Sequence, residues 1–380
     1  MSTHGEHVGE AVATSVADPE EHGSSAGATD ADAGGGRWTS RIRPGALGQF
    51  GIVPALAALI IVGVIVSPNF LTGPNIRDVL VTASVVGVLA VGQGLVILAG
   101  GAGIDLSVGA AMTLSVVVAA RLQDGGMTSV ILASLGTGAS VGVINALGAT
   151  RLRLEPFIVT LATLTMAQGA AYYVSGASPI YFEGDSSLPW LNESAFGIQG
   201  PILVFFFAVL IGQIVLSRTV FGRELYLIGG NEEAAHYAGI PVARRRFVVY
   251  VISGLCAGIA GLLVITQLNT ADPNFGAAYN LQAIAAAVVG GVSLVGGRGS
   301  LLGVAGGVLL IAMVSNILGL LNVNTYVQLI ATGLLVLLAV GLNRRGRESG
   351  LRDLINAIPL IIALLIAGYV IFEVLGSRAS

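Results

Sequence analysis

Long apolar runs, separated by short polar segments, follow one another along the chain from residue 50 to residue 375. A helix needs roughly 20 such residues to cross the hydrocarbon core of a bilayer. The pattern predicts membrane spans at 50–67, 79–99, 107–122, 128–149, 156–176, 201–217, 246–268, 280–295, 300–321, 325–342 and 355–375. The predicted fold class is an all-α polytopic membrane protein with about ten core helices and one extra hydrophobic helix at the C-terminal end.

The composition supports a lipid environment for these runs. Charged residues make up 10% of the chain and apolar residues 54%, whereas a soluble domain has about 25% charged residues. Most glycines lie inside the apolar runs, where small residues let helices pack closely. The Gly254/Gly258 and Gly303/Gly307 pairs have the spacing of such contacts.

The arginines indicate an orientation. If the N-terminus is cytoplasmic and the spans alternate, fifteen of the eighteen basic residues face the cytoplasm, where positive charge accumulates. The longest external loop is then 177–200 and the longest cytoplasmic loop is 218–245. Residues 1–45 are rich in small and acidic residues and are expected to form a disordered cytoplasmic tail.

A short helix is predicted inside the cytoplasmic loop. Asn231 can cap it, and Glu232 and Glu233 in its first turn suit the positive helix end. Gly239 is expected to end it. The segment Asn231–Ala238 should therefore be a short amphipathic helix on the cytoplasmic face.

Four blocks occur in the same order as in a known family: GGAGIDLSVG at 100–109, PFIVTLATLT at 156–165, FGRELYLIGGNEEAAHYAGI at 221–240 and LQAIAAAVVGGVSLVGGRGS at 281–300. Together they resemble the permeases of ribose-type ABC importers, and the resemblance runs from about residue 67 to residue 343. It implies a permease domain over 46–345. The hydrophobic segment 346–380 and the acidic tail lie outside the family pattern.

The resemblance also implies partners and a location. The chain would be a multi-pass protein of the bacterial plasma (inner) membrane. It would pair with a second copy or a paralogue, dock an ABC ATPase subunit or a fused double ATPase, and receive substrate from an extracytoplasmic sugar-binding protein. ATP and Mg²⁺ would bind the ATPase, so this chain would be no enzyme and hold no cofactor. The residues implied in ATPase coupling are Gly229, Gly230, Asn231, Glu232, Glu233, Ala234, Ala235 and Gly239.

Asp105 is the one acidic residue near the middle of the apolar sequence, where an acid is costly and suggests function. Two interpretations stay open: Asp105 caps a helix that begins at Leu106, or it contacts the substrate or a gate. A sugar path would use uncharged amides and hydroxyls, although such groups also bond between helices. The candidate path residues are Gln93, Asp105, Ser107, Asn145, Thr160, Thr163, Gln168, Gln282 and Asn316.

Several other functions are disfavoured. The glycines around Arg298 do not match a P-loop, and the chain has no lysine, so a tight cytoplasmic turn is expected there. No catalytic motif is present, and nothing indicates nucleic-acid binding. The leading hypothesis is an importer permease for a monosaccharide such as ribose or xylose. The alternatives are a nucleoside, a signalling furanose or an amino acid as cargo, or an ion-coupled transporter, which would bury more ionisable groups.

Overall fold

The structure is a computed structural model that describes residues 52–345 except 102, 185–187, 193 and 196. These residues belong to one compact unit of the chain. The predicted disordered tail and the predicted span 355–375 lie outside the described residues.

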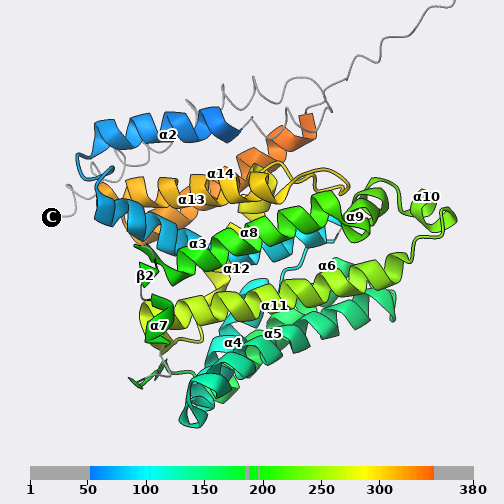
Figure 1. Cartoon of the computed structure of the whole chain (residues 1–380), viewed down its shortest axis with the longest axis horizontal. Coiled ribbons are helices and arrows are strands. Elements are labelled where there is room, and N and C mark those ends of the chain that lie inside the picture. The colour runs from blue at the N-terminus through cyan, green and yellow to red at the C-terminus, as the bar shows by residue number, and fades with distance from the viewer. Residues whose placement is uncertain (1–51, 102, 185–187, 193, 196, 346–380) are drawn as a thin grey trace, which may run out of the picture. The chain divides into compact units, whose positions relative to one another are not determined.

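The described residues are almost entirely helical (Figure 1). The apolar helices are α2 (Ile52–Val66), α3 (Gly73–Leu98), α4 (Val108–Arg121), α5 (Gly126–Thr150), α6 (Pro156–Ser175), α8 (Gly200–Arg218), α11 (Val242–Leu268), α12 (Gly276–Val289), α13 (Leu301–Leu320) and α14 (Thr325–Arg345). Within the described ranges, α3, α5, α6, α8, α11 and α13 are long and apolar enough to cross a membrane, and α2, α4 and α12 are shorter apolar helices. Each coincides with a predicted span. Two predicted boundaries were wrong by six residues. α3 begins at Gly73 instead of 79, with a proline in its first turn. α12 ends at Val289 instead of 295, because Gly290 and Gly291 (φ +87°) turn the chain.

Local sequence explains where several helices begin and end. Proline occupies the first turn of α3, α6 and α8, where a missing N–H costs nothing. The Ser300 side chain accepts the amide of Gly303 and caps α13. Gly176 adopts the left-handed conformation that ends α6.

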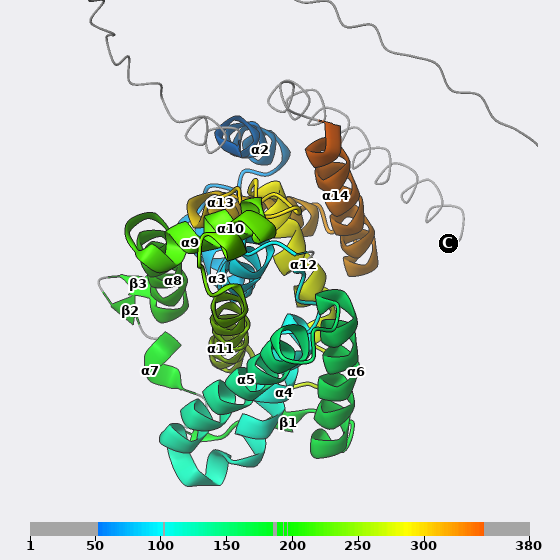
Figure 2. The same cartoon turned by 90° about the vertical axis from the view of Figure 1, so that its right-hand side faces the viewer.

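Helices α3 and α11 form the centre of the bundle (Figures 1 and 2). The protein buries 83% of the apolar stretch of α3 and 72% of that of α11, but only 22% of that of α8. α11 packs on α3, α4 and α5, and α3 also contacts α8, α12 and α13. α6 and α8 present exposed large apolar side chains, among them Phe157, Ile158, Phe206 and Ile211. Such a surface suits contact with lipid chains.

Small residues line the contact between α5 and α11. A Cβ on Gly254 would lie 2.8 Å from the Cα of Gly142, and a Cβ on Gly258 would lie 2.7 Å from the carbonyl oxygen of Ser134. Gly303 and Gly307 pack equally closely on α12. The close contacts predicted from the two glycine pairs are thus confirmed.

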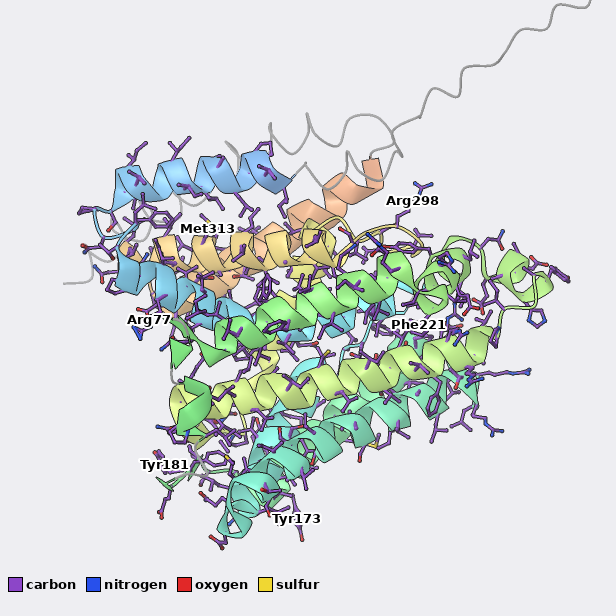
Figure 3. The ribbon with its side chains drawn as sticks, in the orientation of Figure 1. Arg77, Tyr173, Tyr181, Phe221, Arg298 and Met313 are labelled. Atoms are coloured by element: carbon purple, nitrogen blue, oxygen red, sulfur yellow. The ribbon has the colours of Figure 1, made fainter. Side chains whose placement is uncertain are left out.

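Short elements cover the two ends of the bundle. At one end lie Arg77 and Tyr181, and at the other lie Phe221 and Arg298 (Figure 3). The first end carries the 3₁₀ helix η1 (Gln123–Gly125), α7 (Pro189–Asn192) and two antiparallel strand pairs, β1 (Ile180–Tyr181) with β4 (Thr270–Ala271) and β2 (Ser194–Ala195) with β3 (Ile198–Gln199).

The opposite end carries α9 (Val220–Gly230) and α10 (Glu232–Tyr237). Residues 220–230 were predicted to be part of the cytoplasmic loop, and this prediction is wrong, because the segment is helical. Gly222, Leu225 and Ile228 recur at helical spacing and are buried, and Thr219 caps the helix by accepting the amide of Gly222. Gly229 and Gly230, at the end of this segment, make its helical spacing hard to recognise in the sequence.

Candidate functional site

The described residues between α3 and α4 are not helical, although they lie within the protein. α3 ends at Leu98 and α4 begins at Val108, and Gly100 (φ +70°) and Gly101 (φ +67°) make the turn that glycine allows. Gly103, Asp105 and Ser107 in this segment are buried. Irregular backbone at membrane depth is tolerated only where protein encloses it or it lines a cavity. We call residues 99–101 and 103–107 the unwound segment.

Asp105 is the centre of a buried polar cluster within the unwound segment. Its side chain is 1% exposed. Oδ1 accepts hydrogen bonds from the Ser107 amide (2.9 Å), from Ser107 Oγ (2.6 Å) and from Asn145 Nδ2 (3.3 Å). Oδ2 accepts from Ser253 Oγ on α11 (3.1 Å). The carboxyl group therefore joins the unwound segment to α5 and α11.

The structure changes the capping interpretation of Asp105. α4 begins at Val108, two residues later than expected, and Asp105 accepts the amide of Ser107, which precedes the helix. This is a turn stabilised by an aspartate side chain, one step before the helix, instead of a helix cap.

Two further predicted residues hold the backbone of the unwound segment. Gln93 is fully buried on α3, and its side-chain amide faces the backbone of Asp105. In the orientation that satisfies both groups, the Gln93 nitrogen donates to the Asp105 carbonyl (3.0 Å) and the Gln93 oxygen accepts from the Asp105 backbone amide (3.2 Å). Thr160 Oγ1 on α6 lies within hydrogen-bond distance of the Ile104 carbonyl (3.1 Å) and of the Pro156 carbonyl of its own helix (2.9 Å), so its single proton is shared between them. Five of the predicted path residues thus meet in one place: Gln93, Asp105, Ser107, Asn145 and Thr160.

The other predicted path residues lie elsewhere. Thr163 donates to the Val159 carbonyl of its own helix, and Gln168 donates to the Pro273 carbonyl before α12. Asn316 exchanges two hydrogen bonds with Asn75, and Gln282 is half-buried on α12. None of these bonds involves the unwound segment.

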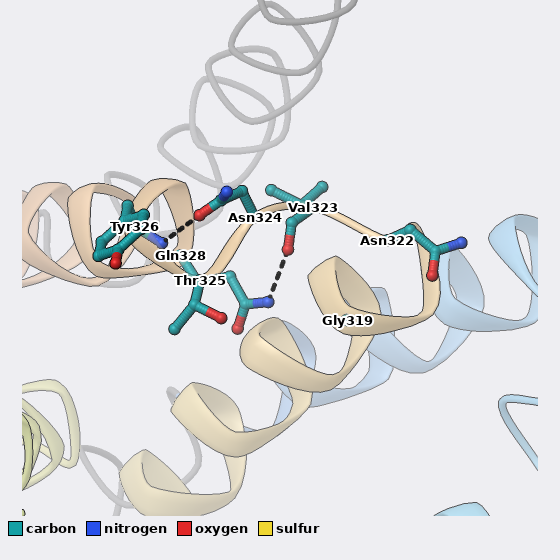
Figure 4. Close-up of a pocket in the computed structure, with 7 residues that line it drawn as sticks. All are labelled: Gly319, Asn322, Val323, Asn324, Thr325, Tyr326 and Gln328. Atoms are coloured by element: carbon teal, nitrogen blue, oxygen red, sulfur yellow. Dashed lines mark hydrogen bonds between the residues drawn. The ribbon is translucent and has the colours of Figure 1, made fainter.

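A pocket of about 660 Å³ lies at the turn between α13 and α14 (Figure 4). The Tyr326 amide donates to Asn324 Oδ1, and Gln328 Nε2 donates to the Val323 carbonyl. These bonds stabilise the first turn of α14. None of the residues that line the pocket belongs to the Asp105 cluster.

The short helix α10 confirms the prediction for the segment after Gly230. Asn231 is its N-cap and accepts the Ala234 amide (2.9 Å). Glu232 and Glu233 occupy the first turn, and Gly239 follows the helix with φ +77°. Ala235 is 3% exposed, so α10 is packed onto the protein by one small side chain.

Arginines at the start of α11 tie α9 and α10 to the bundle. Arg246 forms a two-pronged ion pair with Glu232, with N–O distances of 2.8 and 2.7 Å. Arg245 pairs with Glu224 and lies 5.8 Å from the ring centroid of Phe221. Bidentate arginine–carboxylate pairs fix orientation as well as distance.

Glycines let three backbones meet beside this ion pair. A Cβ on Gly100 would lie 2.7 Å from the Cα of Gly229, and one on Gly297 would lie 2.5 Å from the amide nitrogen of Gly230. The Gly297 amide donates to the Leu98 carbonyl (3.0 Å). We call the contact of Gly100, Gly229, Gly296 and Gly297 the glycine junction. It confirms the tight turn expected around Arg298 and connects that turn to α9 and to the end of α3.

Three site residues, Arg246, Tyr250 and Ser253, are not among those predicted from the sequence. They lie at i, i+4 and i+7 on α11, so they share one face of the helix. Three polar side chains at that spacing on an otherwise apolar span were a detectable signal.

Comparison with known proteins places this arrangement in a family. Residues 75–340 match the family described as "Branched-chain amino acid transport system / permease component". The match includes the unwound segment, the glycine junction and α10.

Curated relatives match over nearly their whole length. The ribose import permease protein of Bacillus subtilis (strain 168) is 39% identical over 79% of this chain and 94% of its own. The D-allose transport system permease protein of Escherichia coli (strain K12) is 36% identical, over 78% and 91%. The L-arabinose transport system permease protein of the same strain is 34% identical, over 78% and 90%.

Proposed function

The chain belongs to this family of transport-system permeases, and from that premise we propose that it forms the membrane channel of an ATP-driven importer for a monosaccharide. A permease is a multi-pass membrane transport subunit without a cofactor or a catalytic reaction of its own. The observation that carries the sugar assignment is that relatives named for ribose, allose and arabinose align over at least 90% of their own length.

We further propose a topology with the N-terminus in the cytoplasm and ten core spans. In this topology residues 1–45 are a cytoplasmic tail, 46–345 the permease domain and 346–380 an additional hydrophobic segment. The distribution of arginines supports it, because most of them then face the cytoplasm. The separation of Arg298 and Phe221 from Arg77 and Tyr181 at opposite ends of the bundle also agrees with it (Figure 3).

Within this topology α10 is the coupling element. It would insert into a cleft of an ABC ATPase, and the permease would work as a dimer that receives sugar from an extracytoplasmic binding protein. α10 suits this role because it is a capped, short helix that projects its acidic turn from the bundle, with Glu232 half exposed. A rigid helix passes on a displacement as a unit.

The unwound segment would form a wall of the translocation path. The polar side chains that neighbouring helices direct at the segment bond to it directly, so in this arrangement they position the wall more than they offer groups to a sugar. They are Gln93, Asn145, Thr160 and Ser253. Binding in the path would be weak, which suits a channel that must release its cargo.

The test is uptake into proteoliposomes that contain the permease with its ATPase, with the binding protein added outside. Labelled D-ribose, D-allose, L-arabinose and D-xylose, together with a labelled nucleoside and a labelled amino acid, are offered with ATP inside, without ATP, and with an ionophore. Uptake of one sugar that needs ATP and binding protein supports the proposal. Uptake that an ion gradient drives without nucleotide would refute it, and uptake of a nucleoside or an amino acid alone would refute the sugar assignment.

A further inference from the structure

The Arg246 side chain touches both α10 and the unwound segment. Its guanidinium holds Glu232 of α10 through two hydrogen bonds. A Cβ on Gly101 would overlap with Nη2 of the same guanidinium, so the group lies directly against the backbone of the unwound segment. One planar cation therefore lies between the element that would meet the ATPase and the segment that would line the path.

We propose that Arg246 is a positioning residue that transmits the displacement of α10 to the unwound segment. This inference rests on the proposed function, because it assigns the internal link between the two parts of that machine. The link is short: it runs from Glu232 through one guanidinium to Gly101 without an intervening residue.

The chemistry of arginine suits this link. A guanidinium is planar and binds a carboxylate with two parallel bonds, so rotation of the carboxylate turns the whole group. A lysine ammonium would keep the charge but would hold Glu232 at a single point. The Arg246 side chain is also enclosed: it is 17% exposed, and its Nε is buried without a partner among the described residues. A partly buried group that is confined on both sides transmits movement because packed interfaces are not continuously deformable.

The same face of α11 extends the link to Asp105. Tyr250 is 3% exposed and lies one turn beyond Arg246, and Ser253 follows and donates to Asp105. The Tyr250 hydroxyl is buried and has no hydrogen-bond partner in the described part of the chain. The oxygen of the Asn145 amide is likewise unpaired. These groups give a displaced unwound segment new partners to bond, so the segment has the means to occupy a second position.

The experiment measures sugar molecules taken up per ATP hydrolysed in the proteoliposomes described above, with the sugar that the wild-type complex transports. The variants are Arg246→Lys, Glu232→Gln and the double variant, and Arg244→Lys is the matched control because Arg244 is exposed on the same helix turn. A misfolded permease would lower transport and stimulated hydrolysis together, whereas a broken link lowers their ratio.

We expect Arg246→Lys to lower the ratio at least tenfold and Arg244→Lys to leave it within twofold. The double variant should be no worse than the poorer single variant, because both changes cut the same link. Losses that multiply in the double variant, or an unchanged ratio in Arg246→Lys, would overturn the inference. Glu232 is half exposed, so we expect Glu232→Gln to fold. If Arg246→Lys fails to assemble, the ratio measured for Glu232→Gln tests the link instead. Failure of the wild-type complex to transport any sugar would instead count against the proposed function.

Discussion

Removal of the Asp105 carboxyl group should destabilise the permease strongly, and the size of the effect follows from its hydrogen bonds. Asp105→Ala leaves the Ser107 amide without an acceptor inside the protein. The hydrocarbon core of a bilayer contains no water that could accept this hydrogen bond instead. An orphaned buried amide costs about 1–3 kcal/mol, and the lost bonds from the Ser107 and Ser253 hydroxyls cost about 1 kcal/mol each. The total is about 3–5 kcal/mol.

Asp105→Asn should cost much less. The asparagine oxygen can take the place of Oδ1 and accept the Ser107 amide. Its NH₂ group would then face Ser253, whose hydroxyl can rotate and accept instead of donate. We therefore expect a loss of about 1 kcal/mol, the usual net value of one hydrogen bond.

The chain carries its own probe for this measurement. Cys256 is the only cysteine and is buried on α11, so a thiol-reactive fluorophore labels it only when the helix bundle opens. In detergent, Asp105→Ala should melt roughly 10 °C below the wild type, and Asp105→Asn within a few degrees of it. Asp78→Ala, an exposed acid on α3, is the control. If Asp105→Ala and Asp78→Ala melt together, the carboxyl group does not hold the unwound segment.

Three further predictions use the same assays. Gly138→Leu should abolish stable folding because Gly138 faces the backbone of Gly254, whereas Gly136→Leu on the open side of α5 should melt within about 2 °C of the wild type. Ala235→Pro removes the bond from the Ala235 amide to the Asn231 carbonyl, so it should reduce ATP-dependent sugar uptake at least tenfold while the membrane level of the protein stays unchanged, as checked by immunoblot. Tyr250→Phe removes a buried unpaired hydroxyl, so it should melt at or slightly above the wild-type temperature and yet transport more slowly, and equal uptake would contradict a second position of the unwound segment.

Apolar length and helix-end residues were sufficient to predict most of the helices. Their positions follow from runs such as 201–217, because a buried or lipid-facing helix needs only apolar content and an end signal. α9 was missed because Gly229 and Gly230 look like loop residues in the sequence, whereas in the structure Gly229 permits close contact with Gly297. The sequence alone does not distinguish a glycine that makes room for another backbone from a glycine that ends a helix.

The polar cluster was predictable only in part for a similar reason. Burial of Asp105 was expected from its position in an apolar region, and Asn145 and Gln93 were correctly chosen as polar groups within spans. Which of these polar groups meet depends on helix packing, which brings α5, α6 and α11 to one segment and leaves Asn316 beside Asn75. Single-residue polarity carries no information about that choice.

The glycine junction and the Arg246 ion pair have complementary mechanical roles. At the junction, Gly100, Gly229 and Gly297 bring backbones into direct contact, so a shift of α9 must move the end of α3 as well. The ion pair joins Glu232 of α10 to Arg246 of α11 by two parallel hydrogen bonds, so it restrains the orientation of α10 relative to α11. A contact of backbones alone would pass on translation but would let α10 rotate freely. Together they restrain both movements, which is what the proposed coupling requires if a small displacement of α10 is to reach Asp105.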